Sequence, residues 1–160
     1  GQSKVAGERR IQEIDGQYYI FRTSWVYSNV GKNFYLTMKK LLNEGNKLNV
    51  VSDQFGVPTS NYFIAHEISK IIKQLHPNNK GIYHFVPSGK CSWFDFVKLI
   101  ATKINSDFDL NKLNPISANN YFTKAIRPQN SVLNNHKIQS TFMIELNHWE
   151  LELDRIINET

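Results

Sequence analysis

Apolar residues recur at helical spacing in several separate stretches of the chain. In each stretch they return every three or four positions, which is typical of an amphipathic helix with one face on a core. The stretches are 2–14, 34–44, 60–75, 92–104 and 149–157. Ser92 and Asp95 have the spacing of a capping box at the start of the fourth stretch. This pattern predicts five helices.

Short runs of β-branched and aromatic residues lie between these stretches and predict strands. The runs are 18–27, 48–51 and 81–86, with one further short strand near 113–116. Gly56 and Pro58 interrupt residues 53–60, which are expected to form a loop. The Asn-rich remainder of 105–140 is expected to be mostly irregular. Alternation of helices and strands predicts an α/β fold.

Composition narrows the class of protein. Hydrophobic residues make up 41% and charged residues 21% of the chain, so a buried core is expected. No run of 18 apolar residues exists, which excludes a transmembrane helix. The single Cys91 excludes an internal disulfide. The formal net charge of +5 is spread along the sequence, without an RNA-recognition octapeptide or helix-turn-helix spacing. We therefore expect a cytoplasmic protein without a nucleic-acid or membrane partner.

Several common sites are missing from the sequence. The five histidines form neither H-E-x-x-H nor a Cys/His pair at ligand spacing, so no metal site is expected. Neither G-x-G-x-x-G nor G-x-x-x-x-G-K-[ST] is present, so no glycine-rich turn holds a phosphate. The chain also begins at Gly1, within a predicted helix. These features favour the second half of a longer α/β protein.

Three clusters combine polar, aromatic and charged residues in a way that ordinary linkers rarely do. The sequence R-T-S-W-V-Y at 22–27 ends a predicted strand with polar groups, at the edge where open α/β sheets bind ligands. D-Q-F-G-V-P-T at 53–59 is the second cluster, and A-I-R-P-Q-N-S at 125–131 is the third. In the third, the guanidinium of Arg127 has the geometry to bind a diphosphate. Taken singly, each cluster is also compatible with a core strand, a turn or a surface loop.

In this order, the motifs resemble the carboxyl-terminal half of the dTDP-4-dehydrorhamnose reductases, a branch of the extended short-chain dehydrogenases/reductases. The resemblance covers essentially the whole chain. The matching stretches are GQSKVAGE at 1–8, RTSWVY at 22–27, GKNF at 31–34, DQFGVPTS at 53–60, GIYHF at 81–85, SWFDF at 92–96 and RPQNSVLNNHKIQ at 127–139. It implies the carboxyl-terminal part of a Rossmann-type NAD(P)-binding fold together with its substrate-binding lobe.

The resemblance implies reduction of the 4-keto group of dTDP-6-deoxy-L-lyxo-4-hexulose to dTDP-L-rhamnose, with NADPH or NADH. The family's signature is Tyr-x-x-x-Lys, and G-Q-S-K at 1–4 matches its last four positions, so Lys4 is the expected catalytic lysine. The tyrosine would directly precede Gly1, and the main cofactor loop would lie in the amino-terminal half. We therefore expect this chain alone to be inactive. Lys4, Thr23 and Ser24 are the expected cofactor-binding residues.

The family's substrate-binding residues carry over in the same way. Trp25 is expected to pack against the sugar, and Asn33, at the start of a helix, to face the diphosphate. Gln54 and the loop from Phe55 to Thr59 are expected to line the nucleotide pocket. Arg127 and Asn130 are expected to bind diphosphate or sugar hydroxyls.

The resemblance also implies a division of the chain. Residues 1–30 and 61–90 would belong to the dinucleotide-binding sheet, and residues 31–60 and 91–160 to the substrate-binding lobe. The two sets are interleaved, so the chain would expose an edge that the amino-terminal half of the family covers. Such an edge favours self-association, so a homo-oligomer is also expected. Three alternatives stay open: a non-catalytic binding subunit on the same fold, like the regulatory subunit of methionine adenosyltransferase; a reductase or epimerase of a related nucleotide sugar; and a nucleic-acid-binding module.

Overall fold

The computed structural model describes residues 1–14, 16–123, 125 and 127–158. Ile126, in the third cluster, lies outside them. The helices are α1 (Gln2–Glu13), α2 (Phe34–Asn43), α3 (Asn61–Ile71), α4 (Trp93–Ile104), α5 (His136–Phe142) and α6 (Trp149–Asn158), with short 3-10 helices η1 (Ile72–Gln74), η2 (Pro77–Asn79), η3 (Leu110–Lys112) and η4 (Ala118–Asn120). The strands are β1 (Tyr19–Arg22), β2 (Val26–Tyr27), β3 (Leu48–Val51), β4 (Phe55–Gly56), β5 (Thr59–Ser60), β6 (Gly81–His84), β7 (Cys91–Ser92) and β8 (Leu113–Ile116).

Side-chain caps define where the central helices begin. The hydroxyl of Ser60 accepts a hydrogen bond from the backbone N–H of Phe63 at 2.9 Å and starts α3. The hydroxyl of Ser92 accepts from the N–H of Asp95, whose carboxylate accepts in return from the N–H of Ser92, both at 3.0 Å. These bonds satisfy donors that a helix terminus leaves unpaired, and they confirm the capping box that the sequence predicts.

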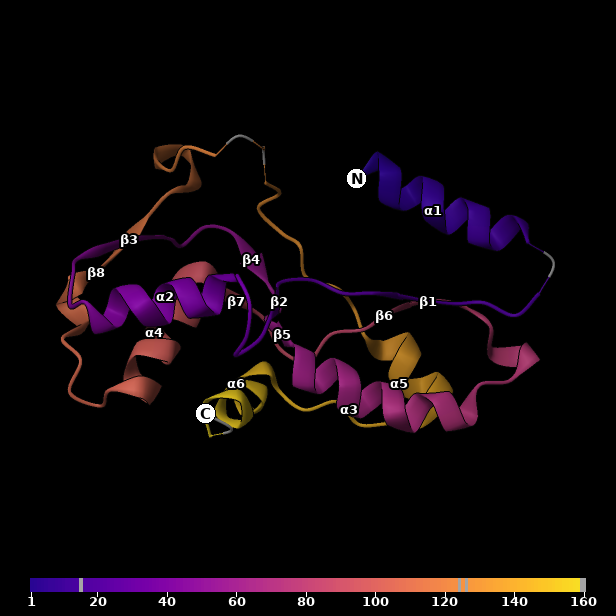
Figure 1. The fold of residues 1–160 in the computed structure, drawn as a ribbon. Helices are drawn as coiled ribbons and strands as arrows, with labels where there is room; N and C mark the ends of the chain where they lie inside the picture. Colours follow the sequence, from indigo (N-terminus) through magenta and orange to yellow (C-terminus); the bar gives the residue numbers. More distant parts are fainter. Residues whose placement is uncertain (15, 124, 126, 159–160) are drawn as a thin grey trace.

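Among the described residues the strands pair in four two-stranded ladders. The pairs β1–β6, β2–β5 and β3–β8 are parallel, and β4–β7 is antiparallel. Figure 1 shows α1 on one side of the β1–β6 pair, with α3 and α5 on the other, while α2 and α4 lie toward the opposite end of the molecule. The α/β fold that the sequence predicts is therefore confirmed.

The buried apolar side chains form two clusters. One cluster fills the space between α2, α4 and α6, with Tyr35, Phe96 and Leu153 at its centre. The other joins α3, α5 and β6 through Phe63 and Tyr83, together with further side chains from α5. Residues of α5 thus pack with the β1–β6 side, although they lie within 91–160. The division of the chain into two sets of segments stays a prediction.

Three details differ from the sequence-based expectations. The run 18–27 forms two strands and not one, because Trp25 adopts a left-handed conformation with φ of 46° between them. The expected loop 53–60 contains β4 and β5, which are held by partners distant in sequence. The expected irregular segment 105–140 contains most of α5, which starts at Asn135 without a side-chain cap.

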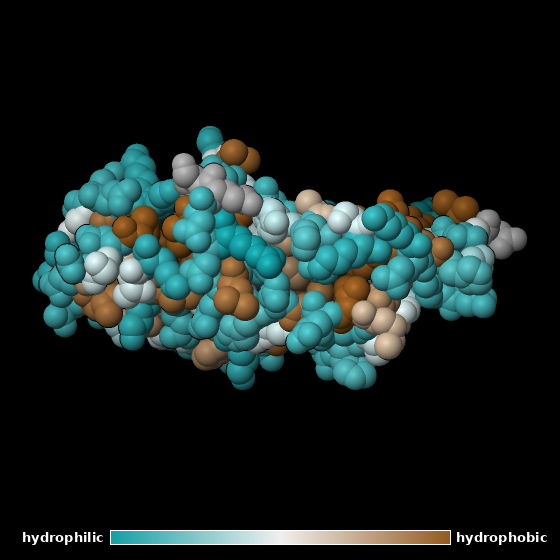
Figure 2. All heavy atoms as spheres, turned by 90° about the horizontal axis from the view of Figure 1, so that it is seen from below, coloured by the Kyte–Doolittle hydropathy of each residue, from teal (hydrophilic) through white to brown (hydrophobic). Residues whose placement is uncertain are grey.

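The outer surface is mostly polar on the face seen from below, where apolar atoms form separate patches among hydrophilic ones (Figure 2). None of the helices that the structure describes is long and apolar enough to cross a membrane.

Candidate functional site

The second and third clusters lie side by side. The backbone N–H of Phe55 donates to the carbonyl oxygen of Gln129 at 2.7 Å, and the carbonyl oxygen of Phe55 accepts from both the N–H and the hydroxyl of Ser131, at 2.9 and 3.0 Å. Phe55 and Asn130 form a parallel bridge. The segment that carries Arg127 therefore runs along β4, beside Gln54.

The first cluster joins the second from the other side. The hydroxyl of Ser24 donates to the carbonyl oxygen of Val57 at 3.1 Å, and the N–H of Thr59 donates to the carbonyl oxygen of Trp25 at 3.2 Å. Val26 then pairs with Thr59 in the β2–β5 ladder. The structure thus brings together three clusters that are about 30 and 70 residues apart in the sequence.

Trp25 lies at the centre of this arrangement. Its indole stacks on that of Trp93, with ring centroids 3.5 Å apart and an angle of 8° between the planes. Phe34, the first residue of α2, contacts Trp93 with ring centroids 4.3 Å apart. The amino-terminal ends of α2 and α4 therefore meet at Trp93, whose indole in turn stacks on Trp25.

Asn33 uses its side chain to start α2. Its Oδ1 atom accepts from the N–H of Leu36 at 3.1 Å, and its Nδ2 atom donates to the carbonyl oxygens of Ser28 and Val30 at 2.9 and 3.2 Å. These bonds fix the loop before α2 and occupy the amide donors. Binding of a diphosphate by Asn33 stays a prediction. Because its amide is already hydrogen-bonded within the loop, this geometry favours an indirect role, in which Asn33 orients the amino terminus of α2.

The residue before Gln54 anchors the second cluster. The carboxylate of Asp53 accepts hydrogen bonds from the hydroxyl of Ser117 at 2.7 Å and from the N–H of Ala118 at 2.8 Å. These two bonds hold the pKa of Asp53 below its usual value, and the bond from the Ser117 hydroxyl has the larger effect. Gln54 itself is half-buried, and its side chain has no hydrogen bond to any described residue.

The polar groups of the third cluster are available to a ligand. Arg127 is exposed, and its guanidinium has no hydrogen-bond or ion-pair partner among the described residues. Asn130 is also exposed; its Oδ1 atom accepts from the N–H of Val132 at 3.0 Å, and its amide donors are without a described partner. Unpaired donors next to a half-buried amide suit an anionic or hydroxyl-rich ligand.

An ion pair ties α1 to the end of β1. The guanidinium of Arg22 donates to both carboxylate oxygens of Glu8, at 2.9 and 2.5 Å. The hydrogen bond and the attraction between the two charges lower the pKa of Glu8 and raise that of Arg22. Lys4 lies one helical turn before Glu8, on the same side of α1.

The ion pair fixes how α1 lies against the end of β1. Figure 1 shows the amino-terminal end of α1 on the same side as the carboxyl end of β1, where Thr23 and Ser24 follow. The side chains of Lys4 and Thr23 are exposed and have no hydrogen-bond partner among the described residues. Unpaired donors at the carboxyl end of a parallel strand pair fit a nicotinamide cofactor, which binds at that edge of Rossmann-type sheets.

Comparison with known proteins identifies the family. The model of the RmlD substrate-binding domain matches residues 1–160. The chain belongs to this family. It is 40% identical to dTDP-4-dehydrorhamnose reductase of Escherichia coli K12, over 99% of the chain and 55% of that protein. It is 38% identical to the spore coat polysaccharide biosynthesis protein SpsK of Bacillus subtilis, over 99% of the chain and 53% of that protein.

Solved structures agree with this result. The dTDP-4-dehydrorhamnose reductase of Bacillus anthracis, in complex with NADP, superposes with a TM-score of 0.89 at 34% identity, over 99% of this chain and 54% of that one. The Clostridium acetobutylicum protein gives a TM-score of 0.88 at 33% identity, with the same coverage. The chain thus spans about half the length of the curated relatives it matches, and the resemblance stated from its motifs is confirmed.

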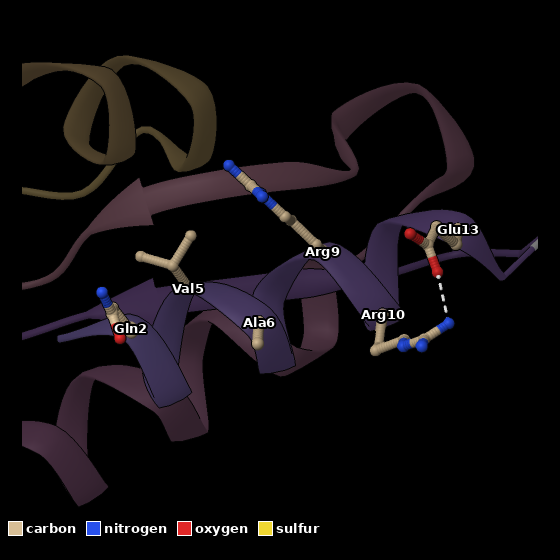
Figure 3. A pocket seen from close by; sticks show the side chains of 6 residues that line it. All are labelled: Gln2, Val5, Ala6, Arg9, Arg10 and Glu13. Atoms are coloured by element: carbon tan, nitrogen blue, oxygen red, sulfur yellow. Dashed lines mark hydrogen bonds and ion pairs between the residues drawn. The ribbon is translucent and has the colours of Figure 1, made fainter.

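Two surface hollows lie away from the residues that the sequence singles out. One, of about 450 Å³, runs along α1 and is lined by Gln2, Val5, Ala6, Arg9, Arg10 and Glu13 (Figure 3). The other, of about 320 Å³, lies between the carboxyl ends of α2 and α4 and the segment 107–112. Because the first is lined by one helix only and neither contains a predicted site residue, the geometry around Trp25 is the better candidate.

Sequence reasoning gave no role to Trp93 or to the Glu8–Arg22 pair. Trp93 stands in the stretch SWFDF, directly after the cap of α4, and its position next to the cap was a usable signal. The ion pair joins residues 14 positions apart on different elements, and only the structure shows that they meet.

Among the described residues, no three or more His, Cys, Asp or Glu side chains gather in an arrangement that could hold a metal ion. The thiol of Cys91 is buried, and burial raises its pKa, so it is a poor nucleophile at neutral pH.

Proposed function

We propose that the chain is the substrate-binding part of a dTDP-4-dehydrorhamnose reductase. The whole protein would reduce the 4-keto group of dTDP-6-deoxy-L-lyxo-4-hexulose to dTDP-L-rhamnose, with NADPH or NADH. The observation that supports this most is the meeting of the three clusters at Phe55 and Trp25, since the activity for which the relatives are named requires a site for a dTDP-linked sugar. Such a protein is expected in the cytoplasm, where its substrates are made; a homo-oligomer also stays part of the proposal.

In this proposal the third cluster binds the charged part of the substrate. The guanidinium of Arg127 is exposed and unpaired among the described residues, so it can donate two parallel hydrogen bonds to a diphosphate. The amide donors of Asn130 would bind diphosphate or sugar oxygens. Gln54, on the adjacent segment, would contact the nucleotide, and Trp25 the sugar.

Lys4, Thr23 and Ser24 would act on the cofactor side. The nicotinamide cofactor, when bound, supplies the hydride that reduces the ketone. The Lys4 ammonium would lower the pKa of the tyrosine hydroxyl of the Tyr-x-x-x-Lys signature, which then donates a proton to the ketone oxygen. Lys4 would also donate a hydrogen bond to the ribose. The Glu8–Arg22 ion pair holds α1 at the end of β1 and so sets the position of Lys4 relative to Thr23.

Calorimetric titration of the chain with dTDP and with dTDP-L-rhamnose tests the proposal. We expect saturable binding of both compounds, weakened about tenfold or more by Arg127→Ala, because hydrogen bonds to a charged group contribute roughly 1.5–3 kcal/mol. Lys73→Ala is the matched control, since Lys73 is an exposed cation on η1, outside the three clusters. Equal binding by the Arg127→Ala variant would contradict the role of Arg127, and no binding by the folded chain would contradict its assignment as a substrate-binding part.

A further inference from the structure

One face of the Trp25 indole is covered by another indole. The planes of Trp25 and Trp93 are nearly parallel, at 8°, and their centroids are 3.5 Å apart. At this distance the rings are in van der Waals contact, so no ligand ring fits between them. Phe34 packs against Trp93 with ring centroids 4.3 Å apart and supports the stack.

The opposite face of Trp25 is covered by the backbone of Gly56. A Cβ atom built on Gly56 would overlap the indole, nearest to Cε2 and at 2.7 Å from both of its bonded neighbours, Cζ2 and Nε1. An atom above the plane of the ring gives this pattern, whereas one in the plane would be closer to Nε1 or Cζ2. If Trp93 lay on the same side of the ring as Gly56, atoms of Trp93 would be nearer to this Cβ than those of Trp25. The three atoms nearest to the Cβ all belong to Trp25. Gly56 and Trp93 therefore lie on opposite faces.

The edge of the Trp25 indole keeps a free donor. The buried side-chain atoms without a hydrogen-bond partner include Nε1 of Trp149 but not Nε1 of Trp25. No hydrogen bond joins Nε1 of Trp25 to a described residue, so this N–H is not fully buried and keeps some contact with solvent. The edge that carries it lies beside Gly56. The preceding residue, Phe55, pairs with Asn130 and follows Gln54.

The backbone of Trp25 is held in a strained conformation. Its φ of 46° lies in the left-handed region, which is unfavourable for a bulky side chain and is found mainly where function or packing requires it. The carbonyl oxygen of Trp25 accepts from the N–H of Thr59 at 3.2 Å, which holds the residue between β1 and β2. The fold therefore fixes both the backbone and the ring of this residue.

We propose that Trp93 and Gly56 clamp the Trp25 indole so that it meets the sugar nucleotide with its Nε1 edge, as a hydrogen-bond donor to a sugar or phosphate oxygen, and not with a face. Trp93 is then a positioning residue that acts through Trp25. This inference rests on the proposed function, and it replaces packing of a ring face on the sugar by a directional polar contact.

The indole N–H signals of a nitrogen-15 NMR spectrum test the inference, because the chain has three Trp residues and each gives one such signal. Single Trp→Phe variants assign the signals. We expect dTDP-L-rhamnose to shift the Trp25 signal, dTDP to shift it less, and neither compound to shift the buried Trp149 signal. A Trp25 signal that does not move while dTDP-L-rhamnose binds would overturn the inference.

Two variants separate an edge contact from a stacking contact. Trp25→Phe keeps an aromatic face but removes the N–H, and Trp93→Leu keeps apolar bulk but removes the stack. We expect each to weaken dTDP-L-rhamnose binding about three- to tenfold, the range for one uncharged hydrogen bond, and to change dTDP binding less than about twofold. Trp149→Phe, outside the clamp, is the control. Wild-type affinity of Trp25→Phe for dTDP-L-rhamnose would overturn the donor role.

Circular dichroism reports the clamp without any ligand. Two indoles in parallel contact couple their electronic transitions and give a paired positive and negative band, which we expect to be lost in Trp93→Leu and in Trp25→Phe and retained in Trp149→Phe. Absence of the band in the wild-type chain would overturn the clamp. If the wild-type chain binds neither compound, the proposed function and the sugar contact are both contradicted. If both clamp variants bind dTDP-L-rhamnose as tightly as the wild-type chain, this inference alone is contradicted.

Discussion

Single residues determine the shape of the candidate site. Gly56 is required because its backbone lies against the indole of Trp25, where any side chain would overlap the ring. Trp25 in turn lies between β1 and β2, directly before β2, and stacks on Trp93. A loop glycine and two aromatic residues from distant parts of the chain thus depend on one another.

This dependence predicts the effect of Gly56→Ala. The added methyl group forces the Trp25 ring or β4 to move, and overpacking of this kind costs about 1–3 kcal/mol of the free energy of unfolding. Urea denaturation followed by Trp fluorescence measures the loss. Gly16→Ala is the control, because a Cβ at Gly16 meets no atom within 4 Å, and its effect should stay within about 0.5 kcal/mol. Equal stability of the two variants would contradict the packing of Gly56 on Trp25.

The sequence singles out candidate residues but not how they are arranged in space. The motifs single out Ser24, Trp25 and Asn130 by residue type and spacing. Their meeting depends on hydrogen bonds between segments about 70 residues apart, such as those of Phe55 with Gln129 and Ser131, and no local pattern encodes such pairs. The family relationship is confirmed, whereas the role of each site residue stays a prediction.

At the scale of elements, α1 differs from the other helices. It has no buried residue, and Val5 and Ile11 are 43% and 44% exposed. Among the described residues, α1 is hydrogen-bonded to a strand through the Glu8–Arg22 ion pair. The element expected to carry the catalytic lysine is therefore held mainly by one polar contact.

We expect Glu8→Gln to loosen α1. A helix of 12 residues is marginal in water on its own, so loss of the ion pair should increase its amide hydrogen exchange several-fold. Exchange measured by mass spectrometry over residues 2–13 gives the readout. Glu13→Gln is a matched control on the same helix, since Glu13 pairs with Arg10 three positions away and links α1 to nothing else described. The same exchange in both variants would contradict the anchoring role of Glu8.

The ion pair also gives this contact a pH dependence. Arg22 lowers the pKa of Glu8 below its ordinary value of 4.5. The ion pair therefore stabilises the position of α1 fully above the pKa of a Glu in the unfolded chain. This stabilisation is lost as the pH falls through the lowered pKa of Glu8 in the folded chain. Acid should thus loosen α1 in the wild-type chain but change little in Glu8→Gln.

Helices were predicted well wherever caps and periodicity agree, as at Ser60 and Ser92. The prediction of one strand over 18–27 was wrong, because the structure has two strands there. The conformation of Trp25 between them is imposed by its partners and not by local propensity. The helix α5 was missed, since it has seven residues and starts at Asn135 without a side-chain cap. The strands β4 and β5 are two residues each and exist only through distant pairing.

At the scale of the whole molecule, the two apolar clusters serve different parts of the proposed reaction. The cluster between α2, α4 and α6 supports Trp93 and Phe34, which hold the side of the site that meets the sugar. The cluster between α3, α5 and β6 supports the β1–β6 pair, whose carboxyl end precedes Thr23. The proposal places the site where these two parts join, with its substrate and cofactor residues taken from interleaved segments of the chain.

This arrangement predicts that the 160-residue chain does not reduce the sugar by itself. No tyrosine precedes Lys4 in its sequence, and no G-x-G-x-x-G motif is present to hold the cofactor diphosphate. Joining the amino-terminal part of the Escherichia coli relative, which the chain does not cover, should give NADPH oxidation that depends on dTDP-4-dehydrorhamnose. In this fusion Lys4→Ala should lower the rate at least about 100-fold, the lower range for a group that assists proton transfer, while Lys73→Ala should not. Absorbance of NADPH follows the reaction. Sugar-dependent oxidation by the chain alone, or a full rate in the Lys4→Ala fusion, would show that the chemistry does not depend on a tyrosine and Lys4 acting together.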